Sequence, residues 1–416
     1  MSQPQRSDDQ REEILFQPSE QSATMEQAEA LRQELADCFT LQKITADRPE
    51  RGHIRFRGYF TRPPVQCYDE LRSRFERHGF TPLIRHDETP ATDQVLGRRA
   101  VVIALPTVFD PPSSNWVINL VLLLATIFSV LFVAAFQELA GQVPPGTDVQ
   151  VLLADTLANL GLGLPFAVAL MLILGAHELG HYFAARHHNV PVTLPYFIPF
   201  PISIIGTMGA FIRLKAPVTN KRALLDIGAA GPLAGMVFAL PILVIGLLTS
   251  DVGPLPPGGY LLEGNSILYA LLKVVTLGRF LPADGIDVSL NQLAWAGWVG
   301  LLVTSLNLIP VGQLDGGHVA YVLFGRRARR LFIPVLITLG ALFVVTEAPI
   351  WIVWAVLLLI FGRVYAVPLD DVTELDGRRR AIAIFTLILF LLVFMPNPLC
   401  AVEPGQDPGI CLRLLP

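Results

Sequence analysis

Charge is scarce in this chain. Charged residues make up only 16% of its 416 residues, hydrophobic residues make up 52%, and the mean hydropathy is +0.51. Soluble globular domains usually carry about 25% charged residues, so this composition indicates a polytopic membrane protein. The net charge is −4 and no basic stripe alternates with aromatic residues. Both facts argue against nucleic acid as a partner.

Cysteine is also scarce, with four residues and no CxxC motif, so we expect no cysteine-based zinc cluster. Cys38 and Cys67 precede the apolar part of the chain, in a region that we expect to be cytoplasmic and reducing. Cys400 and Cys411 share the carboxyl-terminal tail. The sequence leaves open whether these two form a disulfide or stay unpaired.

The first 110 residues lack an apolar run long enough to span a bilayer, so we expect neither a signal peptide nor an early anchor there. Their early acidic residues argue against an organelle transit peptide. We expect an acidic region at 1–50, disordered at its start, and a small α+β cytoplasmic domain at 51–110. The expected elements are a helix at 23–38, a strand at 53–60, a helix at 65–78, and strands at 80–85 and 99–105. This domain could bind a partner or a substrate tail, or be a compact cap without chemistry.

Apolar runs dominate the rest of the chain, and we predict a membrane domain at 111–396 followed by an outer tail at 397–416. The expected count is seven helical spans, within a range of six to eight. The predicted spans are 116–136, 160–185, 224–248, 293–314, 332–346, 350–365 and 381–395. A segment at 266–277 containing Lys273 predicts an amphipathic helix on the outer surface.

Lysine and arginine are unevenly distributed among the loops, which predicts the orientation. Residues 213–222 carry two lysines and two arginines, and 326–330 and 363–380 carry four arginines each, whereas the opposite loops carry only Lys273 and Arg279. The positive-inside rule makes the basic side cytoplasmic. With seven spans, the amino terminus is then cytoplasmic and the carboxyl terminus is outside.

The motif His177-Glu178-Leu179-Gly180-His181 lies within the predicted second span. On a helix, His177 and His181 are one turn apart on the same face, at a separation that suits a single zinc ion. Glu178 points too far around the helix to join that site easily, but it can reach a water beside the metal. Ionisable groups inside a bilayer are costly, which favours a functional site over histidines that merely sit near the interface.

Asp315 lies at the end of the predicted fourth span, on the same side as the histidines. Pro310 breaks that helix, and Gly316 and Gly317 allow a sharp turn that could aim the carboxylate at the second span. A site made by His177, His181 and Asp315 would leave a fourth zinc position open, as catalytic sites require.

HELGH in one span with NLIPVGQLDGG in a later one resembles the site-2 protease family of intramembrane zinc metalloproteases. Gly231 and Gly235, in a GPLAG motif, are also typical of that family. The long amino-terminal region resembles the cyanobacterial and chloroplast branch, the ethylene-dependent gravitropism-deficient and yellow-green proteases. We expect the plasma or thylakoid membrane of a bacterium, in particular a cyanobacterium.

The resemblance implies metal-assisted peptide hydrolysis with one zinc per chain, Glu178 as the base and a transmembrane-helix protein as substrate, within the lipid bilayer. It implies that Asn307 holds substrate or the oxyanion, although an interhelical hydrogen bond explains Asn307 equally well. Residues 192–213 are apolar but broken by prolines and glycines, which resembles the re-entrant hairpin of the family. That hairpin could pair with an unwound substrate strand or simply pack over the site.

Two other classes stay open. A metal-ion transporter could place the same side chains in adjacent spans, but the outer half of the second span carries no further polar residue. A catalytically silent scaffold or chaperone would normally have lost Glu178 or a ligand, and all are present here. The sequence does not name the substrate, the need for a prior cleavage or the oligomeric state.

Overall fold

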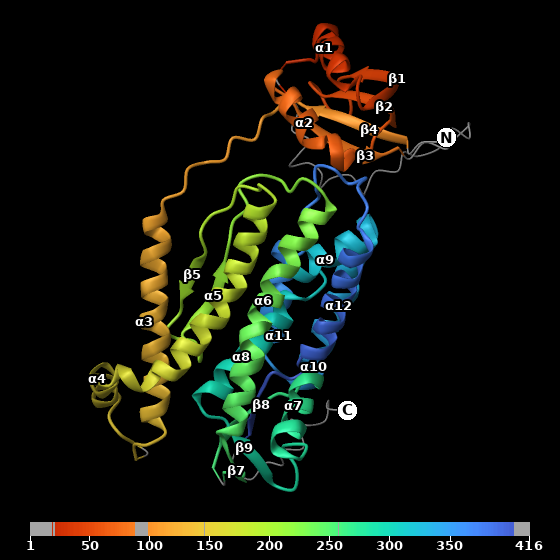
Figure 1. Cartoon of the computed structure of the whole chain (residues 1–416). Coiled ribbons are helices and arrows are strands. Elements are labelled where there is room, and N and C mark those ends of the chain that lie inside the picture. Colours follow the sequence, from red (N-terminus) through yellow and green to blue (C-terminus); the bar gives the residue numbers. More distant parts are fainter. Residues whose placement is uncertain (1–18, 20, 88–98, 145, 257, 403–416) are drawn as a thin grey trace. The chain divides into compact units, whose positions relative to one another are not determined.

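The structure is a computed structural model that describes residues 19, 21–87, 99–144, 146–256 and 258–402 (Figure 1). The predicted disorder at the start of the chain, and Cys411, lie outside these residues. The chain divides into two compact units. The first unit comprises Met1–Pro112, Lys215–Leu224 and Ala366–Arg379, and the second comprises Ser113–Leu214, Leu225–Tyr365 and Arg380–Pro416.

The first unit is built on a four-stranded antiparallel sheet with the strand order β1-β2-β4-β3. Its elements are α1 (Met25–Leu35), β1 (Phe39–Ala46), β2 (Ile54–Phe60), α2 (Pro64–Arg77), β3 (Thr81–His86) and β4 (Arg99–Leu105). Both predicted helices and the three predicted strands are present, with bounds within three residues of those expected. The strand β1 was missed because its polar side chains mix with apolar ones, and only Phe39 is fully buried within it.

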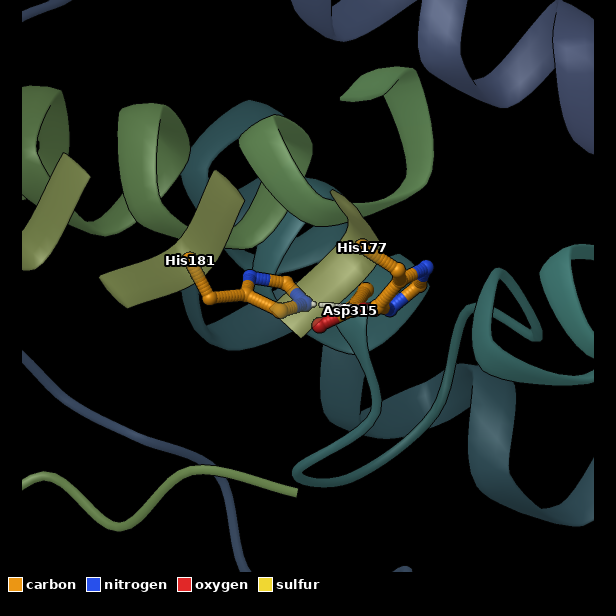
Figure 2. A group of neighbouring side chains, drawn as sticks. All are labelled: His177, His181 and Asp315. Atoms are coloured by element: carbon orange, nitrogen blue, oxygen red, sulfur yellow. Dashed lines mark hydrogen bonds and ion pairs between the residues drawn. The ribbon is translucent and has the colours of Figure 1, made fainter. Parts of the chain in front are cut away.

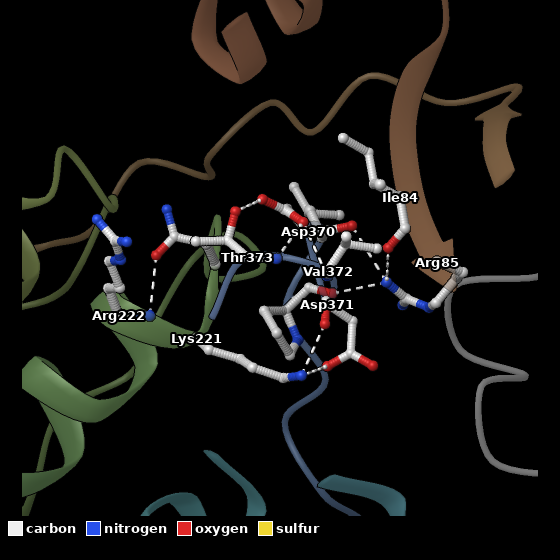
Figure 3. Close-up of polar contacts among 11 residues, drawn as sticks. Ile84, Arg85, Lys221, Arg222, Asp370, Asp371, Val372 and Thr373 are labelled. Atoms are coloured by element: carbon white, nitrogen blue, oxygen red, sulfur yellow. Dashed lines mark hydrogen bonds and ion pairs between the residues drawn. The ribbon is translucent and has the colours of Figure 1, made fainter. Parts of the chain in front are cut away.

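A segment from the far end of the chain extends this sheet beyond β3 (Figure 3). The Ile84 amide donates to the Leu369 carbonyl at 2.8 Å, and the Asp371 amide donates to the Ile84 carbonyl at 3.2 Å. On its other side, the Asp370 amide donates to the Thr219 carbonyl at 2.7 Å. The exposed edge that β3 would otherwise present is therefore covered by the chain itself.

Two basic side chains hold this added segment in place (Figure 3). Arg85 Nη1 donates to the carbonyls of Pro368 at 3.0 Å and Leu369 at 3.1 Å. Lys221 Nζ lies 3.2 Å from Asp371 Oδ1 and donates to the Asp371 carbonyl at 2.7 Å. This arrangement was not predicted from the sequence, because contacts between distant segments leave no periodic pattern.

The second unit is mainly helical. Its helices are α3 (Trp116–Ala140), α4 (Val149–Ala158), η1 (Leu160–Gly163), α5 (Leu164–His187), α6 (Lys221–Leu248, beginning in the first unit), α7 (Ile267–Leu277), α8 (Gln292–Asn307), α9 (Asp315–Phe324), η2 (Gly325–Leu331), α10 (Phe332–Thr346), α11 (Ile350–Phe361) and α12 (Gly377–Val393, also beginning in the first unit). Its strands are β5 (Tyr196–Pro199), β6 (Thr207–Phe211), β7 (Asp251–Pro254), β8 (Tyr260–Glu263), β9 (Ile286–Ser289) and β10 (Leu399–Val402).

Within the part of the chain that the structure describes, four helical stretches are long and apolar enough to cross a membrane: Trp116–Ala140, Leu160–His187, Lys221–Leu248 and Asp315–Thr346. The chain is therefore a polytopic α-helical membrane protein with a sheet-containing amino-terminal region. Among the described residues, α8, α11 and α12 are shorter, with 16, 12 and 17 residues. The count of seven spans stays a prediction.

The predicted span at 293–314 is wrong at its carboxyl end. The helix α8 stops at Asn307, and α9 begins anew at Asp315. Pro310 lacks an amide hydrogen and cannot continue the helix, and Gly312 adopts a φ of +65° that turns the chain. Asp315 is therefore the first residue of a new helix rather than the last residue of a span.

The predicted amphipathic helix near Lys273 is present as α7, but Lys273 does not lie on a surface. Its side chain is fully buried, with Nζ 3.1 Å from Glu263 Oε1 and 3.7 Å from Asp287 Oδ1. The Tyr269 hydroxyl donates to the same Glu263 oxygen at 3.0 Å. This buried group of charges joins α7 to β8 and β9.

This cluster predicts a pH-dependent stability. Burial raises the pKa of the Asp287 carboxyl from 3.8 to about 6. The stability contributed by the protonated form is complete below the unfolded pKa and is lost as the pH rises through 6. Asp287→Asn stays neutral at every pH. We expect its free energy of unfolding in detergent to equal that of the natural chain near pH 4 and to exceed it by about 2 kcal/mol at pH 8. The exposed Asp251→Asn is the control, and a gain for Asp287→Asn that is equal at both pH values would contradict this explanation.

The three cysteines that the structure describes fall into two states. Cys38 and Cys67 are free and buried. Cys400, in β10, is disulfide-bonded, and β10 pairs with β8 in an antiparallel ladder.

Candidate metal centre

The helix α5 supplies two histidine side chains to one buried site. His177 and His181 are 3% and 6% exposed. Their Nε2 atoms lie 3.2 Å apart, and their ring centroids are separated by 4.9 Å. The four-residue spacing on a continuous helix produces this approach, because such residues stand one above the other on the same face.

Asp315, at the start of α9, completes the group (Figure 2). Its Oδ2 atom lies 3.3 Å from Nε2 of His177 and 3.3 Å from Nε2 of His181. The three ligand atoms all lie within 4.8 Å of one another. The position at the amino end of a helix also suits a carboxylate, because the free backbone amides there carry partial positive charge.

Glycines make the turn before Asp315 compact. A Cβ atom at Gly316 would lie 1.9 Å from the Leu308 carbonyl oxygen, and one at Gly317 would lie 2.4 Å from the Gly312 carbonyl oxygen. Any side chain at these positions would push the end of α8 away from the start of α9. The close approach of the backbone therefore requires glycine at both positions.

The three ligand atoms fit a zinc ion. Ligands about 2.0–2.1 Å from zinc at tetrahedral angles lie about 3.3 Å from each other. The observed separations of 3.2, 3.3 and 3.3 Å agree with that value. Two imidazoles and one carboxylate are a donor set that zinc prefers, and three protein ligands leave a fourth position for water or substrate.

The helix α6 fixes the orientation of His181. The Nδ1 atom of His181 lies 2.7 Å from the Ile227 carbonyl oxygen, so it carries the hydrogen and donates it. Because Nδ1 carries the hydrogen, the lone electron pair of Nε2 is free and faces the site. The Ile227 carbonyl was missed in the sequence analysis because a backbone acceptor has no residue type to reveal it.

Gly231 and Gly235, also in α6, provide the space for the two rings. A Cβ atom at Gly231 would lie 2.1 Å from His181 Nε2, which is an overlap. A Cβ atom at Gly235 would lie 3.3 Å from His177 Cβ and 3.4 Å from its Nδ1. Both glycines therefore line the site, and a side chain would be tolerated less well at Gly231 than at Gly235.

Asn307 lies at the same centre, and Glu178 is buried next to the first ligand residue. Glu178 follows His177 on α5 and is 5% exposed. Asn307, the last residue of α8, has its Nδ2 atom 3.4 Å from His177 Nε2. His188 is farther along the chain, where its Nε2 lies 2.8 Å from Asp226 Oδ2 and links α5 to α6.

The predicted hairpin at 192–213 is present as the antiparallel pair β5 and β6. It lies between α3 and α5 (Figure 1). Three polar side chains of α3 hold it: Asn119 Nδ2 donates to the Leu194 carbonyl at 2.9 Å, Ser129 Oγ to Gly206 at 2.6 Å, and Gln137 Nε2 to Ile204 at 2.8 Å. These α3 residues were missed because scattered polar residues in an apolar span show no pattern.

Comparisons with known proteins found one matching family and several similar chains. Residues 165–346 match the model of Peptidase family M50. A protein of Arabidopsis thaliana named probable zinc metalloprotease EGY2, chloroplastic, is 30% identical over 369 residues, which cover 85% of this chain and 62% of the relative. A protein of Oryza sativa subsp. japonica named probable zinc metalloprotease EGY1, chloroplastic, is 32% identical over 309 residues, which cover 68% of this chain and 51% of the relative.

The chain thus spans 62% or less of the length of these two relatives. No solved structure matches it. The family resemblance inferred from HELGH and NLIPVGQLDGG is confirmed by the match over 165–346, which contains both motifs. Residues 165–346 therefore match peptidase family M50, and the chain is similar to the EGY-type zinc metalloproteases of plants.

Proposed function

We propose that this chain is an intramembrane zinc metalloprotease that hydrolyses a peptide bond within or near a transmembrane helix of a membrane protein. The observation that carries the proposal is the meeting of His177, His181 and Asp315 in a buried site built from apolar helices, with Glu178 beside them. A catalytic zinc site needs these donors and an adjacent base. The same chemistry in a membrane gives access to bonds that soluble proteases cannot reach.

We assign one zinc ion per chain to His177 Nε2, His181 Nε2 and Asp315 Oδ2. When bound, zinc supplies Lewis-acid chemistry, since it lowers the pKa of water and polarises a carbonyl group. Glu178 takes the proton from the attacking water and passes it to the leaving amine. The Ile227 carbonyl holds His181 in the required tautomer throughout.

Asn307 provides a test of the substrate contact. The amide nitrogen of Asn307 lies 3.4 Å from His177 Nε2, so it can donate to an oxygen of the substrate at the same centre. We expect Asn307→Ala to lower kcat by about 100-fold, the typical loss for one oxyanion donor, while zinc content stays unchanged. A loss of zinc or of folding with the same loss of rate would instead favour an interhelical role for Asn307.

The hairpin formed by β5 and β6 offers a way to present the substrate. A peptide bond inside a helix is shielded by its neighbours, so the substrate must unwind before attack. In the part of the chain that the structure describes, no third strand pairs with β5 or β6, so an extended substrate can add to this sheet by β-augmentation. We assign the hairpin this role in substrate binding.

The distribution of Lys and Arg supports seven spans with the amino terminus and the zinc site toward the cytoplasm and the carboxyl terminus outside. The disulfide at Cys400 agrees with an outer location of the tail, because disulfides persist in oxidising compartments. We place the chain in the plasma or thylakoid membrane of a bacterium of the cyanobacterial type.

Cleavage of a transmembrane-helix fusion protein by the detergent-purified chain tests the function. We expect the substrate to be cut, the cut to stop when a chelator removes zinc, and activity to return when zinc is restored. A matched substrate whose apolar helix is replaced by a soluble helix should not be cut. Zinc-loaded protein that cuts none of a set of such substrates would favour a silent scaffold. Transport of zinc into vesicles without cleavage would favour a transporter.

A further inference from the structure

The helix α5 ends in two adjacent histidines that the zinc chemistry does not use. His187 is exposed, whereas His188, the residue that caps the helix, is partly buried. His188 Nε2 donates to Asp226 Oδ2 of α6 at 2.8 Å, and the two side chains are 19% and 24% exposed. This pair therefore fastens the carboxyl end of α5 to the beginning of α6.

The pair lies next to the groups that orient a metal ligand. Asp226 directly precedes Ile227, whose carbonyl oxygen accepts the hydrogen of His181 Nδ1 at 2.7 Å. His188 follows His181 by seven residues, which is about two helical turns and places both side chains on the same face of α5. A shift of α6 that separates Asp226 from His188 would therefore also move the Ile227 carbonyl relative to His181.

Small residues form the contact between α5 and α6 around His181. A Cβ atom at Gly180 would lie 2.6 Å from the Ala230 carbonyl oxygen and 3.0 Å from Ala234 Cβ. Small residues let two helix backbones approach closely, but their contacts have little direction and allow the helices to slide. A hydrogen bond has a defined distance and angle, and one to a carboxylate is stronger than one between neutral groups. The bond between His188 and Asp226 supplies the fixed point that the small residues lack.

We propose that His188 and Asp226 are positioning residues of the metal centre, whose hydrogen bond sets the register of α6 against α5 and so keeps the Ile227 carbonyl on His181 Nδ1. This inference rests on the proposed function, because it concerns the same zinc site. The pair acts through the backbone of α6 and not through a contact with zinc. Its effect is on how tightly, and in which geometry, His181 Nε2 can hold the ion.

The zinc affinity of the full chain in detergent, measured by competition with a zinc-binding dye, tests the proposal. We expect His188→Ala and Asp226→Ala each to lower the affinity by about 10-fold, the lower end of the range for groups that orient metal ligands. The double variant should lose no more than either single variant, since all three remove the same bond. His188→Gln, whose amide can still donate to Asp226, should keep most of the affinity. With cobalt in place of zinc, the alanine variants should show a changed visible absorption spectrum, which reports the geometry of the ligands.

Two controls separate positioning from general stability. His187→Ala removes the neighbouring exposed histidine and should leave both the zinc affinity and the cobalt spectrum unchanged. Ser250→Ala removes a hydrogen bond just beyond the far end of α6, where Ser250 Oγ accepts from the Asn291 amide at 3.0 Å. This second control should lower the free energy of unfolding without changing the zinc affinity.

Two results would overturn the proposal. One is a zinc affinity of His188→Ala that equals that of the natural chain. The other is an equal loss of affinity in His188→Ala and Ser250→Ala, which would mean that zinc binding follows overall stability. Affinity and spectrum are measured without substrate. A natural chain that binds zinc but cleaves no substrate would therefore contradict the proposed function, while the affinities would still decide whether this pair positions His181.

Discussion

Glu178→Gln should abolish peptide hydrolysis while leaving the metal in place. The substitution keeps the size and hydrogen-bonding shape of the side chain but removes the carboxylate that accepts a proton from water. A positioned general base contributes about 10²–10⁴-fold to the rate, so we expect at least a 100-fold loss of kcat. Glu178 is not among the three grouped ligand residues, so its loss should not empty the site.

Zinc content and the rate of cleavage of the fusion substrate, measured on the same preparation, check this result. Glu138→Gln is a matched control, because Glu138 is an exposed glutamate on α3 that accepts hydrogen bonds from Gln142 and Gln292. This control should cleave at the rate of the natural chain. Cleavage by Glu178→Gln at more than about one tenth of the natural rate would remove Glu178 from the role of base.

Gly231→Ala should lose zinc, although Gly231 carries no ligand atom. The added methyl group would lie 2.1 Å from His181 Nε2, so either the ring must leave the site or α6 must move away from α5. Mutation of groups that orient metal ligands typically lowers the affinity for the metal by 10–100-fold. A direct overlap with the ligand atom should reach the upper part of that range. We expect zinc affinity to fall by about 100-fold, with a parallel loss of activity.

Gly235→Ala is the matched control for this prediction. Its methyl group would lie 3.3 Å from His177 Cβ, a tight contact that a shift of a few tenths of an ångström relieves. We expect less than a 10-fold change in zinc affinity, measured by competition with a zinc-binding dye. Equal affinities for Gly231→Ala and Gly235→Ala would mean that α6 does not set the position of His181.

Much of the fold could be predicted from local pattern. The strand Arg99–Leu105 and the helix Phe332–Thr346 have the bounds that were expected, because each is a strong periodic or apolar run with clear ends. The spacing of His177 and His181 and the turn before Asp315 pointed to one site, since helix geometry and proline chemistry act over a few residues. Local physics therefore sufficed for the main features of the centre.

The features that were not predicted depend on contacts between residues that are distant in the sequence. Nothing in the sequence around Leu369 indicates that it pairs with Ile84, and the buried state of Lys273 depends on Glu263 and Asp287 from other strands. The predicted fourth span continued too far because apolar residues persist beyond the point where Pro310 ends the helix. Backbone partners such as the Ile227 carbonyl cannot be predicted from residue types, because every residue has a carbonyl group.

Zinc content per chain is the measurement that tests the proposed metal site most directly. We predict about one zinc per chain in the natural protein and in Glu178→Gln, and far less in Asp315→Ala, because removing the carboxylate leaves only two ligands. Circular dichroism and elution volume show that each variant is folded. A folded natural chain that holds no zinc, or an Asp315→Ala variant that holds zinc as tightly as the natural chain, would contradict the assignment of His177, His181 and Asp315 as the metal site.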